Sequence, residues 1–174
     1  MEQTKNNSMN IATALSKRRG ELWILLFERE YNLSDLGKMV GLRPSSVYDH
    51  LEILEKAKLV KYRYESEEGK KGVNKIYTPS FRGVYEQFAK ARRKQLAERD
   101  YQIIDDFLLH PNIKSEFFKG AKAGIKTKDV DPIIRISLVV SEIITGYTKA
   151  IKIKGDKEFE RKKKAFLSVM KKLL

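Results

Sequence analysis

The sequence predicts a mainly α-helical protein that carries a small β-hairpin. Apolar residues recur at helical spacing through most of the chain, and the spacing changes to strict alternation between residues 59 and 78. Proline and glycine stand where helices would begin and end. A stripe of leucines with Trp23 and Phe27 predicts the first helix, over residues 11–29, and the polar residues 1–10 are expected to form a flexible arm.

Two further helices are predicted after the first. Ser34 is placed to cap a short helix, and Gly41 is placed to end it. The apolar face of that helix consists of Leu36, Met39 and Val40. Pro44 then stands at a favoured first position of a longer helix. Three residues of the longer helix face inward at spacings of i, i+4 and i+7, namely Val47, Leu51 and Leu54.

The alternating segment predicts two strands, over residues 59–65 and 73–78. A charged loop that contains Gly69 and Gly72 joins them, which is typical of a hairpin. The order helix, short helix, turn, helix and hairpin is that of a winged helix-turn-helix. The sequence therefore predicts such a domain over residues 11–80.

The second half, residues 81–174, predicts a helical region that dimerises the protein. A long helix is expected over residues 81–109 and is ended by Pro111, with a short segment at 113–119 and a linker at 120–129. Asp131 and Pro132 would start an apolar helix over residues 133–151. Asp156 would cap a last helix, with Phe159, Phe166, Val169, Met170 and Leu173 inward. The helices over residues 81–109 and 133–151 are the candidates for a homodimer interface.

The composition favours a polyanionic partner and a cytoplasmic location. Lys and Arg number 36 against 23 Asp and Glu, a net charge of +13. The chain has no cysteine, which excludes disulfides and thiolate metal sites and suits a reducing compartment. The longest apolar-rich run, residues 133–153, is interrupted by charged residues, so no membrane span is expected.

The segment LSDLGKMVGLRPSSVYDHLEILEKAKLV, followed by a basic hairpin that ends in KIYTPS, resembles the ArsR and MarR families of prokaryotic transcription regulators, and the ArsR family most closely. The resemblance implies a homodimer that binds double-stranded DNA, with the third helix in the major groove and the wings on the flanks. Two residues depart from the family pattern. Arg43 replaces a capping Ser or Thr and places a guanidinium there instead, and Lys58 stands at a turn that usually has Gly.

The candidate DNA contacts lie on the third helix and on the wing. On the helix they are Arg43, Ser45, Ser46, Tyr48 and Asp49, whose hydroxyl, aromatic and charged groups suit phosphates and base edges. On the wing they are Arg63, Lys70, Lys71 and Lys75, which would meet phosphate. The alternatives are a solvated helix face and a hairpin in which Glu65, Glu67 and Glu68 balance the lysines. His50 is interpreted as a partly buried structural group.

The second half is the more basic part of the chain. Residues 10–80 contain 13 basic and 10 acidic groups, whereas residues 81–174 contain 22 and 12. Basic runs such as residues 90–94 and 161–164 either add contacts to the DNA backbone or form a solvated face.

The sequence does not predict an enzyme. It lacks a phosphate-binding Gly loop, and its two histidines, His50 and His110, stand far apart. No cofactor and no metal site are expected, and the sequence identifies no small-molecule effector. The alternative function is that of a winged-helix protein-interaction module in a transcription or RNA-processing assembly.

Overall fold

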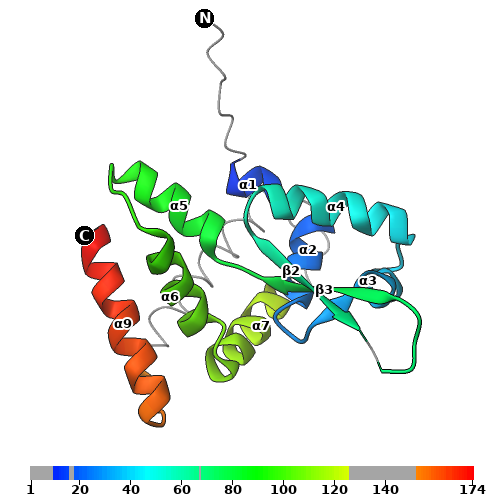
Figure 1. Cartoon of the computed structure of the whole chain (residues 1–174). Helices are drawn as coiled ribbons and strands as arrows, with labels where there is room; N and C mark the ends of the chain where they lie inside the picture. The colour runs from blue at the N-terminus through cyan, green and yellow to red at the C-terminus, as the bar shows by residue number, and fades with distance from the viewer. Residues whose placement is uncertain (1–9, 16–17, 67, 126–151) are drawn as a thin grey trace, which may run out of the picture.

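The computed structural model describes residues 10–15, 18–66, 68–125 and 152–174 (Figure 1). Over these residues the fold is mainly α-helical with a small antiparallel sheet, which confirms the predicted fold class. The predicted arm, apart from Asn10, lies outside the described residues. So does the apolar helix predicted over residues 133–151, together with its start at Asp131 and Pro132.

The prediction of a single N-terminal helix over residues 11–29 is wrong. The structure has two helices there, α1 (Ile11–Ala14) and α2 (Arg18–Leu25). The guanidinium of Arg19 donates to the carbonyl oxygens of Thr13 and Ala14, at 2.9 and 2.8 Å. These carbonyl groups therefore have a hydrogen-bond donor even though the helix does not continue. Gly20 permits the close approach, because a Cβ there would lie 2.5 Å from the carbonyl oxygen of Leu15.

The two helices of the helix-turn-helix are α3 (Leu33–Val40) and α4 (Pro44–Lys56). Asn32 caps α3 through its side-chain oxygen, which accepts the N–H of Asp35 at 2.8 Å, so the predicted cap at Ser34 is wrong. Gly41 ends α3 with a positive φ of 66°, as predicted. The prediction that Pro44 begins the next helix is also confirmed.

The inward faces of α3 and α4 are largely those predicted. Val47, Leu51 and Leu54 are at most 1% exposed. On α3 Leu36 is fully buried, but Met39 is 51% exposed, so its predicted inward position is wrong. The inward stripe of α3 consists of Leu33, Leu36, Gly37 and Val40, at i, i+3, i+4 and i+7, and Met39 lies outside it.

The predicted hairpin is confirmed, and it belongs to a three-stranded sheet. Its strands are β2 (Val60–Ser66) and β3 (Val73–Pro79), and β1 (Tyr31–Asn32) pairs with β3 to give the order β1-β3-β2. Strand β1 was not predicted, because two residues are too few to show an alternation. Lys58, just before β2, has a φ of 57°, the strained conformation expected where glycine is absent.

The prediction of one long helix over residues 81–109 is wrong. Two helices replace it, α5 (Arg82–Ala91) and α6 (Glu98–Leu108). Arg93 has a positive φ of 52°, and the N–H of Lys94 turns back to the carbonyl of Ala89 at 2.8 Å, which closes α5. The N–H of Ala97 then donates to the carboxylate of Asp100 at 2.9 Å, which starts α6.

Two more helices complete the described residues, α7 (Pro111–Ile125) and α9 (Lys157–Leu173). Pro111 begins α7 rather than only ending the preceding helix, and α7 extends through the predicted segment at 113–119 into the predicted linker. The carboxylate of Asp156 accepts the N–H of Phe159 at 2.8 Å, which confirms the predicted cap of α9. The five residues predicted to face inward from α9 are all buried.

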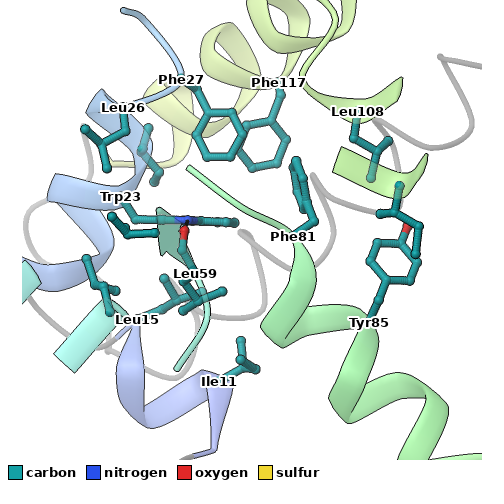
Figure 2. Packing of buried hydrophobic residues seen from close by; sticks show 14 of the residues in the cluster. Ile11, Leu15, Trp23, Leu26, Phe27, Leu59, Phe81, Tyr85, Leu108 and Phe117 are labelled. Carbon is teal, nitrogen blue, oxygen red and sulfur yellow. Dashed lines mark hydrogen bonds between the residues drawn. The ribbon is translucent and has the colours of Figure 1, made fainter. Parts of the chain in front are cut away.

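One hydrophobic core joins the helix-turn-helix to the second half (Figure 2). Trp23 of α2 is fully buried and packs edge-on against Phe27, Phe81 and Phe117, with ring centroids 4.9, 5.9 and 5.8 Å away. Its indole N–H donates to the carbonyl of Leu59 at 2.7 Å. The core thus continues across the boundary at residue 80, and α2 and α7 form part of the same packing unit.

Helix α9 packs on α6. The ring of Phe107 lies 4.7 Å from that of Phe166 and 5.5 Å from that of Phe159. The Lys172 ammonium binds the buried carboxylate of Asp100 at 2.7 Å. Burial raises the pKa of Asp100, but the hydrogen bonds from Lys172 and from the Ala97 N–H outweigh it, so the pKa is held below its ordinary value.

Candidate nucleic-acid interface

Helix α4 presents a polar outer face opposite its buried stripe. Ser45, Tyr48 and Asp49 are exposed, and Ser46 is half-buried. Because the buried residues of α4 fix its rotation about its own axis, these four side chains face away from the core. The structure therefore brings the predicted helix contacts together on one surface.

Arg43 precedes α4 and makes no capping hydrogen bond to it. Its backbone is extended and its side chain is exposed. The first N–H groups of a helix attract anions, and Pro44 lacks an N–H at the first position. The exposed guanidinium of Arg43 thus lies beside the start of α4 and is not used to cap it.

The wing tip carries Lys70 and Lys71 between two glycines. Both lysines are exposed in the loop that joins β2 to β3. Gly69 and Gly72 have positive φ angles of 84° and 129°, which turn the loop back on itself. The loop that contains these two lysines joins β2 to β3 and forms the far end of the hairpin (Figure 1).

Lys75 lies within β3, paired with Tyr64, rather than in the loop at the wing tip. Its ammonium is 3.7 Å from the ring centre of Tyr62, 5.3 Å from that of Tyr77 and 6.0 Å from that of Tyr48, and 4.0 Å from the carboxylate of Glu55. Burial lowers its pKa, but the interactions with Tyr77 and Glu55 outweigh burial and raise the pKa. Lys75 therefore links the wing to α4 through cation–π contacts.

Arg63 is bound by two carboxylates of the protein. Its guanidinium donates to both oxygens of Glu30, at 2.8 and 2.5 Å, and to Glu65 at 3.1 and 2.5 Å. These hydrogen bonds raise the pKa of Arg63 and lower that of Glu30. The pairing joins β2 to the segment before β1 and sets Arg63 apart from the other candidate residues.

Two tyrosines that the sequence analysis did not single out share the surface of Lys75. The register pairs Tyr62 with Tyr77 and Tyr64 with Lys75, so all four side chains lie on one face of the hairpin. Tyr62 and Tyr64 are 40% and 64% exposed, with ring centroids 5.5 Å apart. The alternation in KYRYES would have indicated this tyrosine face.

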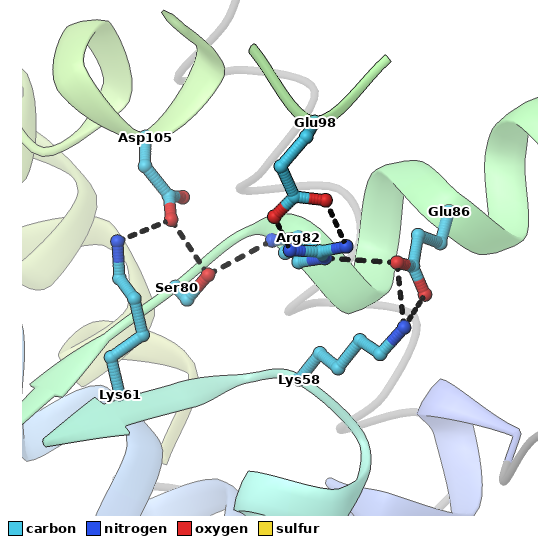
Figure 3. A network of polar contacts seen from close by, with 7 residues as sticks. All are labelled: Lys58, Lys61, Ser80, Arg82, Glu86, Glu98 and Asp105. Carbon is cyan, nitrogen blue, oxygen red and sulfur yellow. Dashed lines mark hydrogen bonds and ion pairs between the residues drawn. The ribbon is translucent and has the colours of Figure 1, made fainter. Parts of the chain in front are cut away.

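The opposite face of β2 is tied to the second half by a polar network (Figure 3). The buried carboxylate of Asp105 accepts the Ser80 hydroxyl and the Phe81 N–H, both at 2.7 Å, and binds the Lys61 ammonium at 2.8 Å. Arg82 binds Glu98, and Lys58 binds Glu86 at 2.8 Å. A cleft of about 480 Å³ opens between these groups.

Other kinds of site find no support in the described residues. They contain no group of three or more His, Asp and Glu side chains placed to hold a metal ion. Every helix in this part of the chain is too short or too polar to cross a membrane. His50 is half-buried, and burial lowers its pKa, which agrees with its interpretation as a structural group.

The geometry of α3, α4 and the wing agrees with a comparison to known families. Residues 16–62 match the family described as bacterial regulatory protein, arsR family. This segment is ArsR-like. The predicted resemblance is confirmed over these residues, which begin two positions before α2, end at Tyr62 in β2 and include the outer face of α4. The wing tip and Lys75 lie beyond the ArsR-like segment.

Comparisons over the whole chain are weaker. No curated protein matches the sequence. A solved structure, of Bacillus subtilis PadR in complex with operator DNA, covers 88% of this chain and 97% of its own, at 16% identity and a TM-score of 0.32.

Proposed function

We propose that this protein is a transcription regulator that binds double-stranded DNA through its winged helix-turn-helix. The observation that carries the proposal is the polar outer face of α4 beside a lysine-tipped wing, within and just beyond the ArsR-like segment. Helix α4 would enter the major groove, and the wing would meet the flanking backbone. The chemistry required is binding only, and no enzymatic step is proposed.

The candidate residues take different roles in this proposal. Arg43 and Lys71 bind phosphates, since both are exposed and neither makes an ion pair among the described residues. Lys70 lies beside Lys71 and adds charge at the tip. Ser46 and Tyr48 contact base edges or sugars, together with Ser45 and Asp49. Lys75 positions the wing against α4, and Arg63 fixes β2 against Glu30.

Replacing Arg43 or Lys71 by Ala is expected to weaken binding to all duplexes alike. Each change removes one phosphate contact, so the slope of log affinity against log salt should fall by about 0.9 in magnitude. Fluorescence anisotropy with duplexes of random sequence at a series of salt concentrations measures this slope. An unchanged slope for both variants would show that neither side chain binds phosphate.

Lys75→Met is the matched comparison for that experiment. It also removes one positive charge from the wing, but the Lys75 ammonium is held over the ring of Tyr62. The variant should lose affinity while keeping the slope of the unmodified protein. A slope that falls as far as that of Lys71→Ala would make Lys75 a phosphate contact instead.

Replacing Ser46 or Tyr48 by Ala is expected to change which sequences are bound rather than the salt dependence. A lost base contact reduces discrimination at the contacted position by about 1–3 kcal/mol. Selection of bound fragments from a random pool, repeated for each variant, gives the preferred sequences. Identical preferences for the variants and the unmodified protein would remove both residues from the base-contacting set.

We further propose that the protein binds as a homodimer, because two half-sites about one helical turn apart suit a two-fold symmetric pair. The second half supplies the candidate interface, as the sequence analysis predicts. Sedimentation equilibrium of the free protein tests this: a monomer at the concentrations that bind DNA would contradict it.

The alternative is a protein-interaction module. The exposed tyrosines of β2 and Val73, which is 61% exposed, favour it because they form a partly apolar surface on the wing. The random-sequence titration separates the two functions. An interaction module would show no salt-dependent binding to duplex DNA, whereas the regulator would.

A further inference from the structure

The turn between α5 and α6 forms a second basic surface. It presents Lys90, Arg93 and Lys94, which we name the basic turn, and all three side chains are exposed. None of them makes an ion pair among the described residues. On the wing, by contrast, Arg63 is bound by two carboxylates and Lys75 by aromatic rings and Glu55. The basic turn therefore carries charge that no acidic side chain of the described ranges neutralises.

The backbone of the basic turn is fixed. The N–H of Arg93 donates to the carbonyl of Lys90 at 3.1 Å, and that of Lys94 donates to Ala89 at 2.8 Å. Leu96, two residues further on, is buried and holds the chain to the core. Arg93 keeps a φ of 52° that glycine would adopt with less strain. The turn therefore holds its three cations on a defined backbone.

The C-terminal end of α9 adds to this surface. A guanidinium nitrogen of Arg92 donates to the carbonyl of Leu173 at 3.3 Å, which places the end of α9 beside the basic turn. Lys171 is exposed there and makes no ion pair among the described residues. The surface gathers positive charge from two helix ends, which accords with the 22 basic and 12 acidic residues of the second half.

The basic turn lies at the opposite end of the molecule from the wing. In Figure 1 the connection between α5 and α6 and the C-terminus stand on the left, whereas α3 and the hairpin loop stand on the right. Two parts of a molecule cannot be closer in space than they are in a projection, so the basic turn and the wing are well separated. A duplex bound by α4 and the wing therefore leaves the basic turn exposed to another ligand.

We propose that the basic turn binds the phosphate backbone of a second segment of duplex DNA, so that one protein joins two duplexes. The inference rests on the proposed DNA-binding function. Phosphate binding needs only point charges on a firm backbone, which this turn supplies. Single-stranded nucleic acid would require open aromatic faces, but the neighbouring ring of Phe88 has the Arg92 guanidinium over it, 4.8 Å from its centre.

A two-duplex capture experiment tests the proposal. One duplex is immobilised, the full-length protein is added, and retention of a second, labelled duplex is measured together with binding of the first. The test variant is K90E/R93E/K94E. The control variant is K152E/K154E/K157E, which changes the net charge equally at the start of α9, where all three lysines are exposed.

The test variant should still bind the first duplex, but its capture of the second duplex should fall roughly tenfold. The slope of log capture affinity against log salt should fall by roughly 3 in magnitude. The control variant should capture as the unmodified protein does. Equal capture by the test variant and the unmodified protein, or equal loss by both variants, would overturn the inference. Preferential capture of labelled RNA or anionic vesicles over the duplex would overturn its assignment to DNA.

The two proposals fail in different ways. If the unmodified protein binds the first duplex but captures no second one, the basic turn is not a DNA site and the proposed function stands. If it binds no duplex at all, the proposed function is wrong, and the inference falls with it.

Discussion

Asp105→Ala is expected to destabilise the protein by about 3 kcal/mol. The carboxylate is the acceptor for the buried Ser80 hydroxyl and the Phe81 N–H, and the variant leaves both donors without it. The ion pair with Lys61 adds little, since that side chain is 55% exposed. Urea denaturation followed by far-UV circular dichroism measures the change in free energy of unfolding.

Asp106 provides a matched control for Asp105. It has the same charge and follows directly in α6, but its side chain is exposed. Asp106→Ala should change stability by less than about 0.5 kcal/mol. Asp105→Asn should fall between the two, because its amide oxygen still accepts the Phe81 N–H. Similar losses for Asp105→Ala and Asp106→Ala would show that the network contributes nothing to stability.

Trp23→Ala is expected to cost about 4 kcal/mol. The side chain is fully buried among three phenylalanines, and its removal leaves a cavity. The Leu59 carbonyl loses the indole donor and keeps only the N–H of Ser80. Because Phe81 and Phe117 belong to the second half, both halves should unfold together in one transition. The same denaturation experiment detects this as a single midpoint shifted to lower urea.

The control for Trp23 is Phe88→Ala. Phe88 is also aromatic but is 42% exposed, so its loss should cost no more than about 1 kcal/mol. Two separate transitions in the unmodified protein, or a Trp23→Ala variant as stable as Phe88→Ala, would contradict the continuous core.

The sequence was sufficient to predict those elements whose backbone conformation is determined by neighbouring residues. Gly41 and Pro44 mark the turn between α3 and α4, and the alternation after residue 59 marks the hairpin. The inward stripe of α4 follows from its spacing alone, and so does its outer face. These features depend on residues within a few positions of one another, which a linear pattern records.

The helix breaks were not predictable because their causes lie in three dimensions. The break before α2 depends on the guanidinium of Arg19 reaching back to two carbonyls and on the close approach of Gly20 to Leu15. The break after α5 has an arginine at the positive-φ position, where a glycine would have signalled a helix end. Apolar spacing continues through the first break, and the second falls in a charged, weakly apolar stretch that has no Gly or Pro, so a single long helix was predicted in each case.

The candidate site was predictable on α4 and less so on the wing. The pairing of Arg63 with Glu30 joins residues 33 positions apart, and no pattern within the hairpin indicates it. The position of Lys75 over Tyr62 follows from the strand register, which the sequence does not give directly. The four basic wing residues were therefore predicted as one set of contacts on the basis of charge, whereas the structure places them in three different environments.

A tethered cleavage reagent tests most directly the claim that the outer face of α4 lies in a DNA groove. The chain has no cysteine, so Ser45→Cys gives one attachment site for an iron chelate that cuts nearby DNA, and Ser115→Cys on the exposed side of α7 gives the control. We expect the Ser45 conjugate to cut bound duplex at a few adjacent positions and the Ser115 conjugate to leave it intact. Cleavage by the Ser115 conjugate alone, or by neither conjugate on duplex that the protein binds, would contradict the account.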